Sequence, residues 1–455
     1  TGRFASRVGV YDNAAELRAG APTLAHALRA AGYHTAVAGK MHFVGPDQLH
    51  GFEERLTTDI YPADVDWTPD WNRPLDDPLP WYHTMESVLA PGVCAAAMQT
   101  DYDEEVSFRA TRKLYEIARH RSEQPYLLFV SFTNPHDPWE IPARFWDRYR
   151  RDEIKGPAVP ALALDEVDPH SRRLRAMCQV DDAGLTDEQV RRARHGYYAA
   201  ISYLDERIGE VLGALRDSGL DERTTVLFCA DHGEMLGERG LWYKMSFLEQ
   251  SARVPLLVRP APGGAPSRPA GPARVSRPVS LADFAPTVLE LAGLDTDAIA
   301  GAGDGVSLVP ALGPGGAPPT HAVVSEYHAE GVQAPSAMIR SGAHKLIVSL
   351  QDPDLFYDLV ADPLEMRDLS DDADSEPAAA SLRAELDRRL DLPAIDREVR
   401  VSQRERHLVS AALRQGAPTP WDHEPRFDAS VAYIRNRTDM YESQRRARLE
   451  TRAPE

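Results

Sequence analysis

Three short polar clusters each follow a hydrophobic stretch that predicts a β-strand. In open α/β sheets, ligands bind beyond the carboxyl ends of the strands, so side chains in these positions can meet. Three such clusters predict one shared site more strongly than any single motif does. The clusters are Lys40-Met41-His42 after residues 35–39, Asn134-Pro135-His136-Asp137 after residues 126–132, and Asp231-His232-Gly233-Glu234 after residues 225–230.

The third cluster contains the best candidate for a metal site. A carboxylate oxygen of Asp231 and a neutral imidazole nitrogen of His232 are adjacent on a turn, and both can face one divalent ion. This mixed set of oxygen and nitrogen ligands favours Mn²⁺, with Ca²⁺ and Mg²⁺ as alternatives. Taken alone, the pair is explained as well by an aspartate that caps a helix beside an incidental histidine. The preceding strand favours the metal site.

Four cationic or potentially cationic side chains predict a site for an anionic group. They are Lys40, His42, His136 and Lys244. Clustered together, they would hold the charge of a sulfate or phosphate during its transfer, and an imidazole could protonate a leaving oxygen. For any one of them alone, an ordinary loop or surface position is the more common explanation.

A loop-like segment is rich in aromatic residues and has two explanations. Such rings could enclose a quaternary ammonium group through cation–π attraction, worth roughly 0.5–2 kcal/mol per contact. The alternative, which the residue types alone favour, is a long loop anchored to the body by buried rings. The residues are Trp67, Trp71, Trp81, Tyr82 and His83.

The elements that must position these residues predict an α/β fold. Strands and helices alternate through about residue 310, which is typical of a mostly parallel sheet flanked by helices. Short strands and two helices follow, and they predict a smaller α+β region. We expect strands at 35–39, 126–132, 225–230, 254–258, 322–327, 336–340 and 345–350, and helices at 103–120, 187–218, 280–292, 376–389 and 397–413.

The change in pattern divides the chain into three predicted parts. Residues 1–313 form a catalytic α/β domain, residues 314–415 an α+β subdomain, and residues 416–455 a charged tail. The tail also carries the aromatic residues Trp421, Phe427 and Tyr433.

Composition excludes several classes of protein. The 455 residues include 51 Lys and Arg against 70 Asp and Glu, a net charge of −19, which argues against nucleic-acid binding. No apolar run approaches the about 18 residues of a membrane span, and the first 30 residues lack the pattern of a signal peptide. We therefore predict a cytoplasmic location. Cys94, Cys178 and Cys229 have no spacing typical of a zinc site or a disulfide framework.

Several motifs together resemble the sulfatase family of the alkaline phosphatase superfamily, and within it the choline sulfatases. The resemblance covers nearly the whole chain. It implies an alkaline-phosphatase-like fold and hydrolysis of a sulfuric ester, choline-O-sulfate, to choline and sulfate. It also implies a homo-oligomer, a dimer or tetramer, whose C-terminal tails are exchanged. The motifs are Gly39-Lys40-Met41-His42, Asn134-Pro135-His136, Asp231-His232-Gly233-Glu234, Lys244, the stretch 355–365, and the stretches 10–13, 40–52, 58–62, 240–245 and 428–436.

The resemblance also implies roles for individual residues. Asp231 and His232 would bind a divalent metal, Ca²⁺ or Mn²⁺. His42 would remove a proton during elimination of sulfate, Lys40 would contact the sulfate, and His136 and Lys244 would serve the leaving group. Recognition of the choline group would fall to Asn13, Trp67, His83 and Glu326, with Asp428 or Asp439 from a neighbouring tail closing the site.

The beginning of the chain matches only part of the family's nucleophile signature. That signature is Cys or Ser-x-Pro-x-Arg followed shortly by Thr-Gly, and Thr1-Gly2-Arg3 matches its end. The cysteine that the family converts to formylglycine, the signature arginine and an upstream aspartate pair are not in the sequence. We therefore expect an N-terminally truncated sulfatase that, as written, lacks the covalent nucleophile and half of its metal ligands.

Two alternatives remain at this point. One is a phosphonate monoester or phosphodiester hydrolase of the same superfamily, which shares an Asp-His metal pair. The other is a choline-binding fragment without catalytic activity, which the absence of a nucleophile in the sequence favours.

Overall fold

A computed structural model describes most of the chain. The described residues are 1–74, 77–121, 123–262, 264, 274–299, 303–313, 316, 320–417, 420–436 and 438–449. The boundary predicted between residues 313 and 314 therefore lies at the edge of what is described. No helix among these residues is both long enough and apolar enough to cross a membrane.

A parallel sheet lies at the centre of the large domain. Its strand order is β2-β1-β4, formed by Glu54–Arg55, His34–Gly39 and Tyr126–Ser131. β1 and β4 pair in register over their full length, from His34 opposite Tyr126 to Gly39 opposite Ser131. Because the two strands are parallel, Lys40 and the residues after Ser131 emerge at the same edge of the sheet.

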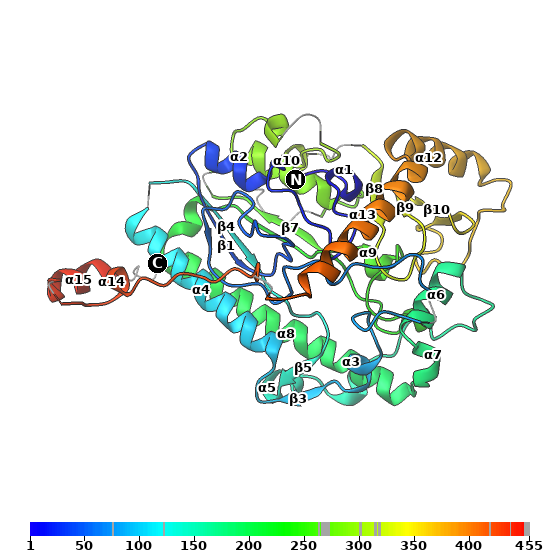
Figure 1. Cartoon of the computed structure of the whole chain (residues 1–455), viewed down its shortest axis with the longest axis horizontal. Helices are drawn as coiled ribbons and strands as arrows, with labels where there is room; N and C mark the ends of the chain where they lie inside the picture. The colour runs from blue at the N-terminus through cyan, green and yellow to red at the C-terminus, as the bar shows by residue number, and fades with distance from the viewer. Residues whose placement is uncertain are drawn as a thin grey trace.

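Helices cover both faces of this sheet, as Figure 1 shows. Alternate residues of β1 point to opposite faces. Ala38 packs with α4 (Met98–His120), while Val37 packs with Ala25 of α2 (Leu24–Ala30). The long helix α8 (Asp187–Asp217) lies against α4, and α10 (Phe284–Leu291) lies against α2.

A second pair of strands completes the large domain and differs from a purely parallel arrangement. β6 (Val226–Cys229) and β7 (Leu256–Arg259) pair antiparallel, with Phe228 opposite Leu257. No ladder joins β4 to β6 among the described residues, although the hydroxyls of Tyr126 and Thr224 lie 2.7 Å apart. Strand direction cannot be read from hydrophobic periodicity, so the sequence predicted these strands but not their pairing.

The C-terminal subdomain is an antiparallel sheet with two helices. The order β11-β10-β9-β8 is formed by Leu355–Asp358, His344–Ser349, Ser336–Ser341 and Val323–Tyr327. Gly342 has φ 58° in the tight turn between β9 and β10, a conformation that glycine adopts without strain. α12 (Glu376–Arg389) packs Leu382 and Leu386 against the sheet, and α13 (Leu392–Leu413) packs Leu392, Ile395 and Val399 against it.

Two predicted helices begin earlier in the structure. α4 begins at Met98 rather than 103, where the Thr100 hydroxyl accepts a hydrogen bond from the Ala97 N–H at 2.9 Å. α13 begins at Leu392 rather than 397, because the Asp391 carboxylate accepts the Ala394 N–H. Both helix starts use local side-chain caps that the apolar pattern does not reveal.

The remaining elements are short. The tail helices α14 and α15 project from the body as an arm, at the left in Figure 1. The short elements are α1 (Ala5–Val8), α3 (Glu86–Leu89), β3 (Gly92–Cys94), β5 (Glu140–Pro142), α5 (Ala143–Trp146), α6 (Pro169–Met177), α7 (Val180–Ala183), α9 (Glu249–Ala252), α11 (Val309–Leu312), α14 (Ala429–Ala432), α15 (Met440–Ala447) and the 3₁₀ turns 151–153, 220–223, 238–240, 281–283 and 296–299.

Candidate active site

The Asp231-His232 pair lies beside Lys40, so the ends of β1 and β6 meet. The Lys40 Nζ is 3.4 Å from the Asp231 Oδ2, and the His232 Nε2 is 3.6 Å from the same oxygen. Burial opposes the charge of Asp231, but Lys40 and His232 lower the pKa of its carboxyl to about 2. The carboxylate is therefore ionised throughout the neutral range.

The donor set of this pair fits a divalent cation. The Nδ1–H of His232 donates to the Gly233 carbonyl at 2.8 Å, which leaves the Nε2 lone pair free to bind a metal. Ligand atoms 3.6 Å apart can both reach one ion at bond lengths of about 2.0–2.2 Å. A carboxylate oxygen beside a neutral imidazole suits Mn²⁺, and Ca²⁺ would draw mainly on the oxygen.

The backbone after the pair is fixed against helix α9. The Gly233 N–H donates to the Ser251 carbonyl at 2.7 Å, and the Glu234 N–H to the Gln250 carbonyl at 3.0 Å. A Cβ on Gly233 would collide with the Gln250 carbonyl oxygen, so a side chain there would displace this turn. The Glu234 carboxyl accepts the Tyr243 N–H at 2.5 Å, and burial raises the pKa of Glu234 to about 8. This bond positions the residue before Lys244.

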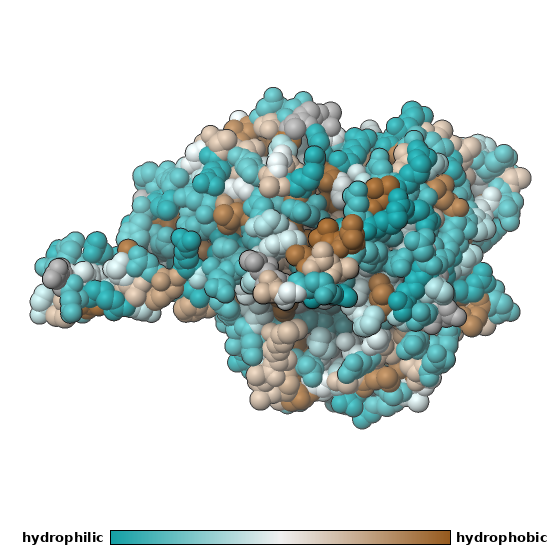
Figure 2. All heavy atoms as spheres, in the orientation of Figure 1, coloured by the Kyte–Doolittle hydropathy of each residue, from teal (hydrophilic) through white to brown (hydrophobic). Residues whose placement is uncertain are grey.

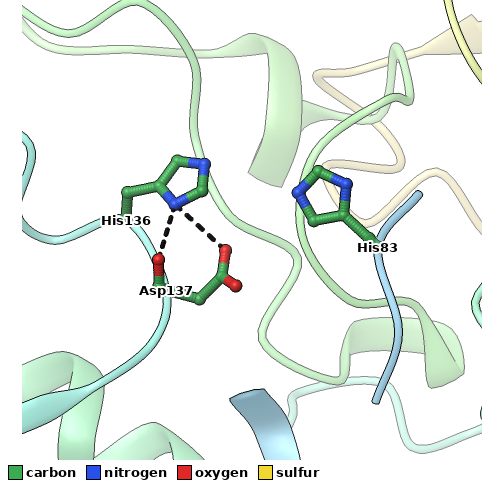
Figure 3. Close-up of side chains that lie close together, drawn as sticks. All are labelled: His83, His136 and Asp137. Carbon is green, nitrogen blue, oxygen red and sulfur yellow. Dashed lines mark hydrogen bonds and ion pairs between the residues drawn. The ribbon is translucent and has the colours of Figure 1, made fainter. Parts of the chain in front are cut away.

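Lys244 is held between two histidines. Its Nζ lies 2.7 Å from the His136 Nε2 and 3.0 Å from the His83 Nε2. The His136 Nδ1 faces the Asp137 carbonyl oxygen at 2.8 Å and a carboxylate oxygen of Asp137 at 3.1 Å, as Figure 3 shows. Both oxygens are acceptors, so Nδ1 carries the proton of His136 and Nε2 accepts from Lys244. Burial, together with Lys244 and Lys40, lowers the pKa of His136 well below its ordinary value.

His83, His136 and Asp137 also form a cluster of potential metal ligands. Their ligand atoms lie within 4.8 Å of one another, and the two rings face each other in Figure 3. The Lys244 ammonium, however, already bonds the Nε2 atoms of both histidines. The chain therefore provides its own cation at this position, and the Asp231-His232 pair is the better candidate for a metal.

His42 is oriented by its backbone. Its φ is 52°, an unusual value for a residue with a side chain, and its N–H donates to the Asp59 carboxylate at 2.8 Å. Asp59 is in turn paired with Arg55. Burial and the ammonium groups of Lys40 and Lys244 lower the pKa of His42 to about 4, against the opposite effect of Asp59. His42 is therefore neutral at pH 7 and can accept a proton.

This low pKa predicts a loss of stability in acid. An unfolded histidine takes up its proton near pH 6.5, whereas folded His42 does so only near pH 4. Above pH 6.5 both states are neutral at this residue, and the stability is complete. As the pH falls towards 4, the unfolded state binds the proton and the folded state does not, so the free energy of unfolding decreases. The decrease is about 2 kcal/mol at pH 5. Urea unfolding at pH 7.5 and 5.0 should show a smaller acid loss for His42→Gln. The exposed His120→Gln is the control, and equal losses in both variants would contradict the prediction.

The aromatic segment divides into buried and partly buried rings. Trp71 and Tyr82 are buried, and the Trp71 Nε1–H donates to the Ala329 carbonyl at 3.2 Å, so these two rings anchor the loop. Trp67 and Trp81 are only partly buried and stack at 5.9 Å with an interplanar angle of 11°. The Trp67 ring also lies 5.5 Å from His42. Trp71 and Tyr82 therefore fit the anchored-loop explanation, and Trp67 and Trp81 stay candidates for enclosing a cation.

The carboxylate nearest His83 belongs to Glu330, which the sequence did not single out. Its Oε1 lies 3.7 Å from the His83 Nδ1, and its side chain is buried. Burial raises the pKa of Glu330. Glu326, the predicted residue, instead accepts hydrogen bonds from the backbone and hydroxyl of Ser6 and lies 3.4 Å from the His328 Nε2. In the sequence, Glu330 could have been identified as a site residue by its position in the Ala329-Glu330-Gly331 turn after β8.

The other predicted recognition residues lie near the surface. Asn13 is exposed, next to Asp12, whose carboxylate pairs with Arg406 of α13. Asp428 and Asp439 cap the two tail helices by accepting the N–H groups of Ser430 and Glu442.

Comparison with known proteins identifies the family. Residues 1–294 match the model of the sulfatase family, residues 397–449 that of the choline sulfatase C terminus, and residues 237–391 that of the N-sulphoglucosamine sulphohydrolase C terminus. The chain is 47% identical over 445 residues to the choline-sulfatase of Rhizobium meliloti (strain 1021), spanning 96% of this chain and 85% of that protein.

Solved structures share the fold. The phosphonate monoester hydrolase of Silicibacter pomeroyi superposes with a TM-score of 0.64 at 23% identity, and that of Agrobacterium radiobacter with 0.63 at 25%. Each alignment covers 85% of this chain and 83% of the other. The predicted alkaline-phosphatase-like α/β fold with an antiparallel C-terminal subdomain is confirmed. The chain belongs to the sulfatase family, and its C-terminal residues carry the segment typical of choline sulfatases.

Proposed function

We propose that this protein hydrolyses choline-O-sulfate to choline and sulfate. The observation that carries the proposal is the position of Tyr61, which lies between the Lys40 ammonium and the Trp67 ring. On the side of the lysines, the Tyr61 ring lies 5.2 Å from the Lys40 Nζ and 6.0 Å from the ring of His136, which bonds Lys244. It lies 5.4 Å from the Trp67 ring on the aromatic side. A substrate with a sulfate at one end and a quaternary ammonium at the other matches this arrangement.

The chain's own residues would bind and orient the sulfate. Lys40 and Lys244 offset the negative charge that the sulfate presents during transfer. Asp231 and His232 would hold the divalent cation, Mn²⁺ or Ca²⁺, and when bound it would polarise a sulfate oxygen as a Lewis acid. We further propose that the nucleophile of the reaction is the formylglycine that the sulfatase family uses.

The hydrogen bonds and pKa shifts of Lys244, His136 and His42 suggest which of them donates and which accepts a proton. Burial lowers the pKa of Lys244, so its ammonium can donate a proton to the choline oxygen as the S–O bond breaks. His136, neutral and with its Nε2 accepting from Lys244, orients that ammonium. His42 is neutral and accepts a proton in the elimination of sulfate.

Recognition of the choline end would rest on the stacked Trp67–Trp81 pair and on Glu330. A carboxylate near His83 supplies the negative charge that a trimethylammonium group requires. We expect Trp67→Ala to weaken choline binding about 2- to 30-fold, which corresponds to one lost cation–π contact. Calorimetric titration of this chain with choline measures the effect, and the exposed Phe108→Ala on α4 is the control. Equal affinities for the two variants would count against the aromatic site.

The reaction is tested with three esters. The protein carrying the Cys-x-Pro-x-Arg segment ahead of Thr1 should hydrolyse choline-O-sulfate with a higher kcat/KM than an aryl sulfate or a phosphonate monoester. Preference for the phosphonate would support the alternative hydrolase instead. Choline binding without turnover would support the non-catalytic alternative. The same protein assayed after chelation, with Mn²⁺ or Ca²⁺ restored separately, identifies the metal.

We also propose that the protein is a homo-oligomer, a dimer or tetramer, that exchanges its tails. The arm projects away from the body in Figure 2, and apolar side chains on it are exposed: Phe427, Val431, Tyr433 and Tyr441. An arm with such a surface favours burial against a second copy. In that assembly Asp428 or Asp439 could close a neighbour's choline site. Light scattering of the chain with and without residues 416–455 tests the proposal, and a monomeric mass for both would refute it.

A further inference from the structure

We propose that Asp103 and Gln99, on the first two turns of α4, are positioning residues that fix the orientation and tautomer of His136. The proposal extends the function proposed above, in which His136 orients Lys244. Neither residue belongs to the polar clusters that follow the strands. Both lie in the first turns of α4.

Asp103 is buried, and its hydrogen bonds run to the turn that precedes His136. Its carboxylate accepts the Thr133 N–H at 2.7 Å, the Asn134 N–H at 2.9 Å and the Asn134 Nδ2–H at 2.9 Å. Burial raises the pKa of Asp103 to about 6, although these hydrogen bonds act in the opposite direction. A buried carboxylate is costly unless its acceptor sites are used. Here they are used to hold one turn of backbone.

Gln99 holds the other end of the same turn. It is one helical turn before Asp103 and so lies on the same face of α4. Its Nε2–H₂ donates to the Asp137 carbonyl oxygen, the oxygen that also accepts the His136 Nδ1–H. This carbonyl, together with the Asp137 carboxylate 3.1 Å from Nδ1, decides which nitrogen of His136 carries the proton. Gln99 and Asp103 thus fix the backbone on both sides of the histidine.

The consequence reaches Lys244. Only the Nδ1–H tautomer leaves the His136 Nε2 able to accept the Lys244 ammonium at 2.7 Å. α4 also contacts the neighbouring loop, because the Tyr102 hydroxyl donates to the Thr58 carbonyl at 2.8 Å, next to the Asp59 that orients His42. One face of α4 therefore contacts the loops of both histidines.

The experiment compares Asp103→Asn with Asp101→Asn, which removes the same charge at an exposed position of the same helix. The Thr133 and Asn134 N–H groups bond different oxygens of Asp103, so the amide introduced by Asp103→Asn would place its N–H₂ group against one of these two donors. The tautomer is read by ¹⁵N NMR of histidine-labelled protein without substrate, and His136→Gln assigns the signal. We expect a single Nδ1–H tautomer for His136 in the unaltered chain and in Asp101→Asn, and a detectable second tautomer in Asp103→Asn.

Gln99→Met keeps the side-chain length but removes the donor, and it carries the test if Asp103→Asn does not fold. A single Nδ1–H tautomer in the folded variants would overturn the proposal. The tautomer is measured without turnover, so this result is independent of whether choline-O-sulfate is the substrate. In the active enzyme, Asp103→Asn should also lower kcat more than it raises KM, because the substrate contacts remain.

Discussion

Replacing Lys244 with methionine is expected to lower the kcat for choline-O-sulfate about 10²- to 10⁴-fold, the range typical of a lost general acid. Methionine preserves the volume of the side chain but cannot bond His83 or His136. The same change should raise the pKa values of both histidines, because Lys244 contributes to lowering each of them. Steady-state kinetics and histidine NMR titration measure the two effects on one variant.

Lys155→Met is the matched control, since Lys155 is exposed and lies outside the site. A kcat for Lys244→Met within threefold of the control would contradict the role of Lys244 as proton donor. If kcat is unchanged but the histidine pKa values rise, Lys244 interacts electrostatically with the histidines but does not donate the proton.

The second large effect is expected at Lys345 of β10, where the C-terminal sheet faces helix α9. Its buried Nζ lies 2.7 Å from the Glu365 Oε1 and 2.9 Å from the Glu249 Oε1. We expect Lys345→Met to lower the free energy of unfolding by about 3–5 kcal/mol, because it leaves the buried Glu365 without a cation. Denaturant unfolding measures the loss.

The double variant Lys345→Met/Glu365→Leu tests whether stability is lost because a buried charge is left unpaired or because a bond is removed. Replacing both partners by apolar side chains should recover most of the stability, since no buried charge then remains unpaired. A single-variant loss below about 1 kcal/mol would contradict the prediction. Glu365 also accepts the Glu249 N–H at 2.8 Å at the start of α9, which fixes the turn after Asp231 and His232. Lys345→Met should therefore also weaken divalent metal binding.

The sequence predicted the elements of the fold and the groups that converge on the site. Lys40, His136 and His232 follow strands. Residues that come just after a strand lie at the edge of the sheet where that strand ends, so their position does not depend on the conformation of the other loops. Lys244 was identified by residue type and by resemblance. It meets His83 and His136 through a loop whose course depends on Glu234.

Residues whose role depends on side-chain direction were harder to predict. Glu326 and Glu330 are four positions apart. The register of β8 directs Glu326 towards Ser6, and the turn after β8 brings Glu330 near His83. Asp103 was expected at the start of a helix, where an acidic residue is ordinary. Its burial follows from the earlier start of α4, which places it inside the second turn.

Among the described residues, the edges of β4 and β6 that face each other have no strand partner. An exposed strand edge is a template for another extended segment, because its backbone N–H and C=O groups have no partner. In the part of the chain that the structure describes, β4 offers such an edge to the side on which Tyr126 touches Thr224. A segment that paired there would join the two sheets into one. The edge therefore fits an extended segment, whose backbone would complete the hydrogen bonds that β4 and β6 leave open.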